Sequence, residues 1–446
     1  MITRRSFIGT TGLAFLGLQR YAGAEPATRL IEPFGPLLAD PAGVIDLPEG
    51  FTYRILSRRG EIMADGFKTP GQPDGMAAFP AADGKIVLVR NHELALKSVA
   101  DGPFPDNSLI PEGVQSFDGG PDGKKPHLGG TTNLVFDPKS GKTVSQFLSL
   151  TGTDRNCAGG PMPWGSWITC EEPEDLTSER GKGHGWCFEV KATNGGGLQQ
   201  PVPLKALGRF RHEAVALDPG TGMLYLTEDR TDGLLYRFIP TVKGDLSRGK
   251  LQALAISGKP SADLRNYQRE SKWPVESEPL SAEWIDLDDV ESPRDDLRIR
   301  GHKAGAARFA RGEGIHWVDG VFYICCTDGG PSRRGQIFKL EPKADGNDVL
   351  ELFLQPEKSD LLTNGDNLCP APWGGIVICE DLIDASFSPA AHVRCVTPEG
   401  KIFTLAKNRK NGEFAGGCFS PDGKWFFVNL MGQGLTVAIT GPWEKA

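Results

Sequence analysis

The sequence predicts an all-β fold, and more narrowly a six-bladed β-propeller with a central metal site. One observation is compositional: 57 glycines and 34 prolines among 446 residues are more than helices tolerate. A second is a unit that recurs six times, with no segment of convincing helical period between the copies. A two-sheet sandwich is the competing all-β fold, but it does not explain why one turn pattern recurs.

The repeated unit has the pattern of a two-stranded hairpin. Each copy begins with small or polar residues, continues through a short apolar segment, turns at a glycine-containing pair, and ends in β-branched and aromatic residues. Further apolar strands follow several copies, as at 233–240 and 335–342, so we expect four strands in each blade. The copies occupy residues 74–93, 156–172, 212–229, 312–328, 365–381 and 416–429.

The first 24 residues, MITRRSFIGTTGLAFLGLQRYAGA, combine a twin arginine, an apolar run and a small-residue end. This pattern predicts a signal peptide at 1–24, recognised by the twin-arginine export machinery, and a periplasmic or secreted protein. The apolar run is shorter than the roughly 20 residues of a membrane span, so we expect no stable membrane anchor. Residues 25–446 are predicted to form a single propeller domain with a polar insertion near 240–300.

Charge and cysteine content narrow the possible partners. The formal net charge is −8, and the predicted signal peptide contains three arginines and no acid, so the mature chain is more acidic still. This balance argues against nucleic acid as a partner, and we expect a monomer that acts on a small molecule. Most of the nine cysteines lie in apolar runs and not at disulfide spacings, so we interpret those as buried thiols.

Acidic residues recur at matching positions of the copies. The innermost strand of each propeller blade lines the central channel, so matching positions form a ring. Acids at strand ends are commonly turn caps. Their recurrence favours a metal site instead, because so many like charges cannot share one axis without a compensating cation. The predicted metal ligands are Cys157, Glu171, Glu172, Glu213, Glu228, Asp229 and Glu313.

The residue types indicate the chemistry. Carboxylates suit hard ions such as Ca²⁺, and Cys157 adds a softer, transition-metal component, although a small buried hydrophobe is the alternative reading of that cysteine. Arg311 lies two residues before Glu313, so both face the same side of an extended strand. Arg311 either grips a phosphate or carboxylate oxygen or pairs with Glu313. Asn91 and His92 are also predicted to contact substrate, an ordinary hydrogen-bonded histidine being the alternative.

Six stretches, in order along nearly the whole chain, carry a family resemblance: TRRSF, NCAGGPMPWGSWITCEE, RHEAVALDPGTGMLYLTED, ARGEG, DNL and FAGGCFSPDGKWFFVNLMGQGLTVAITGPW. Together they resemble the PhoX-type alkaline phosphatases. The resemblance implies a six-bladed propeller that hydrolyses phosphate esters at two bridged Fe³⁺ ions and Ca²⁺. It also implies that Cys157 bridges the ferric ions and that Arg311 contacts the phosphate. The acidic ligands implied are Glu171, Glu213 and Glu313, with Glu172, Glu228 and Asp229 matched to the motif but not to a particular ion.

The expected reaction is metal-assisted phosphoryl transfer. The sequence has no evident GxSxG element, so a serine hydrolase mechanism lacks a nucleophile candidate. Two other functions stay open. A calcium-dependent lactonase-like propeller, or another ester hydrolase, would use central acids without needing Cys157. A non-catalytic binding propeller would tolerate loss of the acid ring.

Overall fold

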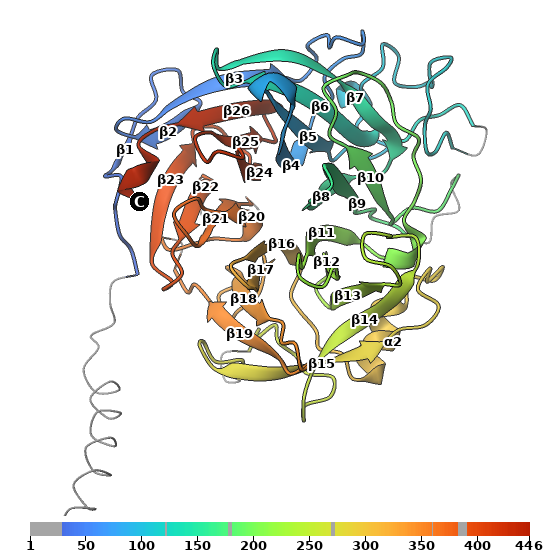
Figure 1. Ribbon diagram of the computed structural model, residues 1–446, viewed down its shortest axis with the longest axis vertical. Coiled ribbons are helices and arrows are strands. Elements are labelled where there is room, and N and C mark those ends of the chain that lie inside the picture. Colours follow the sequence, from blue (N-terminus) through green and yellow to red (C-terminus); the bar gives the residue numbers. More distant parts are fainter. Residues whose placement is uncertain (1–28, 121–122, 177–180, 269–272, 359, 382–389) are drawn as a thin grey trace, which may run out of the picture.

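The computed structural model describes residues 29–446 apart from 121–122, 177–180, 269–272, 359 and 382–389. This part of the chain is an all-β propeller, in which antiparallel sheets stand around a common centre (Figure 1). The predicted signal peptide at 1–24 lies outside the described residues.

Three sheets have short, regular strand orders. The first, from the centre outward, contains β4 (Pro73–Pro80), β5 (Ile86–His92), β6 (Gly129–Asp137) and β7 (Lys142–Thr153). The next contains β8 (Asn156–Met162), β9 (Ser166–Glu171) and β10 (Cys187–Lys191). The last in the chain contains β24 (Phe414–Phe419), β25 (Phe426–Leu430), β26 (Leu435–Thr440) and β3 (Thr52–Arg58).

Two sheets are larger. One runs β11 (His212–Leu217), β12 (Leu224–Glu228), β13 (Leu235–Pro240), β14 (Gly249–Ile256), β15 (Pro279–Asp286), β19 (Asp348–Leu354), β18 (Gln336–Glu341), β17 (Val321–Cys326) and β16 (Gly312–Val318). The other runs β20 (Gly365–Pro370), β21 (Ile376–Glu380), β22 (His392–Val396), β23 (Ile402–Asn408), β2 (Ile45–Pro48) and β1 (Leu37–Leu38).

The inner strands form a closed ring. In the described residues β4 contacts β8, and the contacts continue through β11, β16, β20 and β24 before returning to β4. Figure 1 shows the ends of these strands around the centre of the molecule. Each inner strand is the first strand of a hairpin that sequence analysis identified as a repeat. The propeller prediction is therefore confirmed at the level of the all-β fold.

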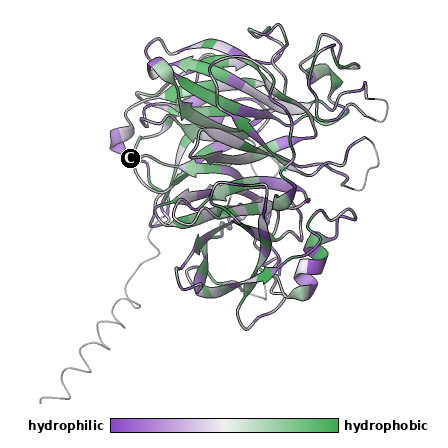
Figure 2. Ribbon diagram, turned by 45° about the vertical axis from the view of Figure 1, so that its right-hand side comes forward, coloured by the Kyte–Doolittle hydropathy of each residue, from purple (hydrophilic) through white to green (hydrophobic). Residues whose placement is uncertain are grey.

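Apolar side chains fill the space between neighbouring sheets. One cluster, for example, joins Val377 of β21 and Val393 of β22 to Phe426 of β25 and Val437 of β26. Figure 2 shows the hydrophobic colouring concentrated on the strands, with hydrophilic residues in the connecting loops. Packing of this kind buries both faces of each sheet, so the strands hold the inner ring in place.

Residues 240–300, predicted as an insertion, contribute β14, β15 and the helix α2 (Leu297–Ala304). Strand β14 pairs with β13, and β15 joins β14 to β19, so this segment extends a sheet at the rim. Short 3₁₀ helices occupy Ala82–Gly84, Val99–Asp101, Lys205–Leu207 and Trp443–Lys445. Among the described residues, none of the helices has the length and apolar character that crossing a membrane requires.

Candidate metal centre

Each inner strand has a β-bulge close to its first residue. The register with the second strand of the sheet shifts between Pro73 and Met76 in β4, between Asn156 and Gly159 in β8, and at the matching place in the other inner strands. A bulge bends the strand and redirects the side chains of the extra residues. The bulged positions of five inner strands hold the acids and the thiol of the centre: Asp74, Cys157, Glu213, Glu313 and Asp366.

Two overlapping groups of donor atoms lie at this centre. The Sγ of Cys157 and carboxylate oxygens of Glu172 and Glu213 lie within 4.8 Å of one another. Oxygens of Glu213, Glu313 and Asp366 do the same, so Glu213 links the groups. Metal ions with ligand distances of about 2.0–2.5 Å fit between atoms at such separations. We define the central cluster as Asp74, Cys157, Glu172, Glu213, Glu313 and Asp366.

Burial and mutual repulsion control the charge of the central cluster. Burial, followed by the charges of Asp366 and Glu172, raises the pKa of Glu213 well above its usual range. The pKa of the Cys157 thiol is raised well above its usual value by burial and by Glu213. The carboxyl pKa values of the other members are raised in the same way: Asp74, Glu172, Glu313 and Asp366.

The cluster therefore fits metal ions by its own chemistry. One oxygen of Asp74, Oδ1, is buried without a hydrogen-bond partner. Buried carboxylates can ionise together only when positive charge is bound among them. Several oxygens and one sulfur form a donor set for hard cations with a softer ion beside the thiolate.

Three arginines lie over the cluster on its solvent side. Arg155 pairs with Glu93 and Glu172, and Arg211 pairs with Glu172 and Asp229. Asp229 also pairs with Arg311, so arginines and acids alternate across this layer of side chains.

The third arginine also ties this layer to the cluster. Arg311 donates to both oxygens of Asp229 at 2.7 and 3.0 Å and to Glu313 at 2.7 Å. The side chains of the three arginines are 21–24% exposed, whereas those of Glu172, Asp229 and Glu313 are only 2–6% exposed. A ligand that arrives from solvent therefore meets guanidinium groups first.

Two predicted ligands point away from the cluster. Both oxygens of Glu171 are engaged elsewhere, by the backbone amides of Asp154, Gly185 and Trp186 and by the ring of His184. Glu228 accepts hydrogen bonds from the Leu234 amide and the Tyr236 hydroxyl.

The acids that directly follow these two residues, Glu172 and Asp229, lie at the centre instead. Glu171 and Glu228 are the last residues of β9 and β12, and successive side chains of an extended chain point to opposite sides. Glu172 therefore joins the central cluster, and Asp229 lies beside it and pairs with Arg211 and Arg311. Of these four predicted ligands, the structure brings Glu172 into the central cluster and Asp229 beside it, and it gives Glu171 and Glu228 other partners.

Asn91 and His92, predicted to contact substrate, have protein partners instead. The Asn91 amide donates to the carbonyls of Cys157 and Ala158, and its oxygen accepts from Trp167 and Thr169. The His92 ring contacts the Gly71 carbonyl and the Thr132 hydroxyl.

The contacts of Asn91 support the centre, and those of His92 tie β5 to β6 and to the Gly71 carbonyl. Asn91 holds the backbone of β8 through the carbonyl groups of Cys157 and Ala158. With its polar atoms so engaged, Asn91 has no donor left for a phosphate, and we do not carry the two residues forward as substrate contacts.

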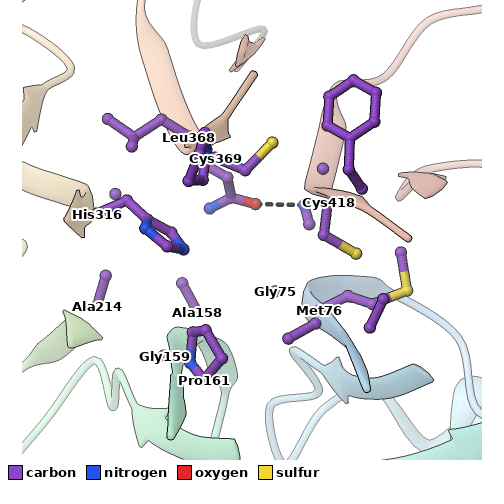
Figure 3. A pocket seen from close by; sticks show the side chains of 18 of the residues that line it. Gly75, Met76, Ala158, Gly159, Pro161, Ala214, His316, Leu368, Cys369 and Cys418 are labelled. Atoms are coloured by element: carbon purple, nitrogen blue, oxygen red, sulfur yellow. Dashed lines mark hydrogen bonds between the residues drawn. The ribbon is translucent and has the colours of Figure 1, made fainter. Parts of the chain in front are cut away.

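An apolar cavity of about 450 Å³ lies on the other side of the cluster. It is lined by residues that follow cluster members in their strands, including Gly75, Ala158 and Ala214. Figure 3 shows these small residues beside larger apolar side chains such as Met76 and Leu368. The charged groups of the site are thus confined to the side that the arginines cover.

The predicted site residues leave out four residues of the site: Asp74, Asp366, Arg155 and Arg211. A signal for the arginines is present, because RNC, RHE and RGE place an arginine two residues before Cys157, Glu213 and Glu313. Aligning the copies on the bulge would have shown this spacing. Asp74 opens the first copy, where its place is the counterpart of the Cys157 position.

The fold and the site define a β-propeller with a buried, acid-rich centre suited to metal ions and an arginine layer suited to anions. The chain matches the family described as alkaline phosphatase PhoX over residues 32–434, and it belongs to this family. The protein is therefore a phosphoric ester hydrolase, and the resemblance noted from its sequence motifs is confirmed.

The first of three similar solved structures supports the same fold. The structure of Pseudomonas fluorescens PhoX in complex with vanadate, a transition state analogue, has a TM-score of 0.67 at 18% identity and covers 92% of this chain and 98% of that chain. A gluconolactonase of Xanthomonas campestris, XC5397, matches with a TM-score of 0.43, 12% identity and coverage of 92% and 98%. A protein of unknown function from Dyadobacter fermentans matches with a TM-score of 0.46, 10% identity and coverage of 88% and 100%. A comparison with curated proteins found no match.

Proposed function

We propose that this protein is an exported, metal-dependent phosphatase that hydrolyses phosphate esters at an iron and calcium centre in the propeller channel. The observation that carries the proposal is the central cluster itself: buried carboxylates converge around one thiol, beneath arginines that face solvent. Acids with raised pKa values in such a place favour bound cations, and the arginines favour an anionic substrate.

The central cluster divides by donor type. Cys157, Glu172 and Glu213 combine sulfur with oxygen and are the proposed holders of two bridged Fe³⁺ ions. Glu213, Glu313 and Asp366 offer oxygen alone, which suits Ca²⁺. When bound, these ions supply Lewis acidity toward a phosphoryl group.

The arginines of this chain bind and orient the phosphoryl group. A guanidinium group presents a planar fork that matches two phosphate oxygens, and charge-assisted bonds of this kind are the strong ones. Arg155, Arg211 and Arg311 each hold a carboxylate in the structure, so each fork is already fixed in direction. Fixed donors stabilise charge that develops in the transition state at little reorganisation cost.

Family membership favours a phosphatase over the lactonase-like and non-catalytic alternatives. The vanadate bound by the Pseudomonas fluorescens protein is a transition state analogue there, which supports phosphoryl transfer in a propeller of this kind. The proposed substrate is a small phosphate ester.

The finer architecture is part of the proposal. We place six blades around the channel, two of them, β11–β14 and β16–β19, joined at the rim by β15. The order of contacts among the inner strands supports this count. Residues 25–446 would form a single domain with an insertion near 240–300. A signal peptide at 1–24 would direct the folded monomer through the twin-arginine route to the periplasm or beyond.

Replacing the thiol tests the centre. We expect Cys157→Ala to remove iron and hydrolysis of an aryl phosphate together, because the variant lacks the one soft donor of the cluster. Elemental analysis and a colorimetric assay measure the two effects. Cys395→Ala is the matched control, since Cys395 is equally buried but lies in the apolar core between β22 and its neighbours. Wild-type iron content and activity in Cys157→Ala would exclude the proposed centre.

A further inference from the structure

Asp118, His127 and His184 form a second group of metal-ligating side chains, apart from the central cluster. Their donor atoms lie within 4.8 Å of one another, and their side chains are only 2–7% exposed. Asp118 and His127 belong to the segment between β5 and β6, and His184 belongs to the connection between β9 and β10. The group thus joins two connections from neighbouring sheets.

The separations suit one tetrahedral ion. Oδ2 of Asp118 lies 3.1 Å from Nε2 of His184 and 3.7 Å from Nε2 of His127. Ligands of a tetrahedral zinc ion at about 2.1 Å lie about 3.4 Å apart, between these two values. The longer distance exceeds that of a hydrogen bond, so no direct bond between His127 and Asp118 accounts for it.

The other nitrogen of each imidazole ring has a carboxylate near it, but only that of His184 is close enough for a hydrogen bond. Nδ1 of His184 lies 2.7 Å from Oε1 of Glu171, and Nδ1 of His127 lies 4.0 Å from Oδ1 of Asp154. Carboxylates behind histidine ligands are a regular feature of metal sites, because they fix which nitrogen carries the proton. Nδ1 of His127 is also buried without a hydrogen-bond partner.

The group of Asp118, His127 and His184 is separate from the central cluster, although the adjacent residues Glu171 and Glu172 contact one each. Glu171 faces His184, while Glu172 faces Cys157 and Glu213. A cavity of about 330 Å³ borders both histidines and is also lined by Asp154, Arg155 and Glu174. This cavity gives a fourth ligand access to the group.

We propose that Asp118, His127 and His184 bind one Zn²⁺ ion, with Glu171 orienting His184 and the fourth position open to the cavity. The ion would pin the segment before β6 to the connection that follows β9. Glu171, which sequence analysis assigned to the central ions, thereby serves a different metal. The competing description is a metal-free cluster in which His184 is protonated between Asp118 and Glu171.

Cobalt substitution tests the site in the mature protein with its central ions in place. We expect added Co²⁺ to produce the visible absorption of a tetrahedral complex, and about one equivalent of Zn²⁺ to abolish it. His127→Gln should lose the band, and Asp118→Asn provides a second variant of nearly unchanged size. Zn²⁺ should raise the unfolding temperature of the wild type and leave that of His127→Gln unchanged.

Two controls separate this site from the central one. His302→Gln should keep the cobalt band, because His302 lies on α2 and contacts the Ala306 carbonyl. Cys157→Ala should also keep it, since the thiol is not part of the zinc site. No band in the wild type, or an equal band in His127→Gln, would establish the metal-free cluster. Loss of the band in Cys157→Ala would assign the cobalt to the central cluster and likewise overturn the proposal.

Discussion

Adjacent acids have opposite surroundings at two places in this protein. Glu171 is held by three backbone amides and His184, whereas Glu172 faces Cys157 and two arginines. Glu228 and Asp229 repeat this division. The cause is the alternation of an extended chain, which sends one side chain of each pair into the sheet and the other to the centre.

This division predicts different outcomes for two neutral substitutions. Glu171→Gln should lower the free energy of unfolding by about 2–4 kcal/mol, because charged, buried hydrogen bonds are weakened, while the central metals stay bound. Glu172→Gln should keep the fold and lower metal content and activity. Urea unfolding and elemental analysis distinguish the two. Equal metal loss in both variants would show that Glu171 is a central ligand after all.

The proposed role of Arg211 in phosphate binding can be tested by substitution. Arg211→Lys keeps the charge but removes the planar fork, so we expect kcat/KM for an aryl phosphate to fall by about 10- to 100-fold. Inhibition by inorganic phosphate should weaken in parallel. Arg237→Lys is the control, because Arg237 pairs with Asp348 and Gln252 at the rim. An unchanged kcat/KM in Arg211→Lys would remove this arginine from the phosphate site.

At the scale of elements, the inner strands depend on close approach as well as on bulges. A Cβ on Gly160 of β8 would lie 1.8 Å from the Val215 carbonyl oxygen of β11. On Gly314 of β16 it would lie 2.6 Å from the Asp366 carbonyl oxygen of β20. Glycine at these positions lets neighbouring sheets come close enough for their bulged residues to form the central cluster.

Adding a methyl group at this contact should therefore separate the sheets. We expect Gly160→Ala to lower the free energy of unfolding by about 1–3 kcal/mol, the usual range for overpacking, and to reduce metal retention. Gly195→Ala is a matched control, because nothing lies within 4 Å of a Cβ at that position. The comparison uses urea unfolding and elemental analysis. Equal stability of the two variants would show that a methyl group fits between β8 and β11 and would contradict the prediction.

At the scale of the whole molecule, the ring of sheets is closed by strands from the two ends of the described chain. Strand β3, near the start, pairs with β26, near the end, and completes the sheet that follows β20–β23 around the ring. Closure brings acids from all around the ring to one axis, where burial raises their pKa values. Ions bound at the central cluster, as proposed above, would therefore stabilise the closed fold.

This coupling predicts how pH affects the metal-free protein. An acid whose pKa is raised on folding keeps its proton in the folded chain at pH values where the unfolded chain has lost it, so the free energy of unfolding falls as pH rises above about 4.5. After treatment with a chelator, we expect lower stability near pH 8 than near pH 5. Calcium should remove the difference and restore activity. Urea unfolding with and without Ca²⁺ measures the effect, and a pH-independent metal-free protein would contradict it.

The repeated hairpins of the fold could be predicted from short stretches of sequence, because a hairpin is specified by residues that are close together in the chain. Gly320 in its turn, and the β-branched and aromatic residues of β17, show how one copy could be recognised. Four members of the central cluster, Cys157, Glu172, Glu213 and Glu313, were found in the same way, whereas Asp74 and Asp366 were not. The protein partners of Asn91 and His92 could not be predicted, because those partners lie on strands and loops distant in sequence.

The sequence by itself determined the all-β class, the recurring hairpins and the gathering of acids with one cysteine, since each rests on residue type and short-range spacing. Only the tertiary structure decided which acid of each adjacent pair faces the centre, that arginines cover the central cluster, and that Asp118, His127 and His184 meet. Those outcomes depend on bulges and on contacts between sheets, and neither is encoded in any single stretch of the chain.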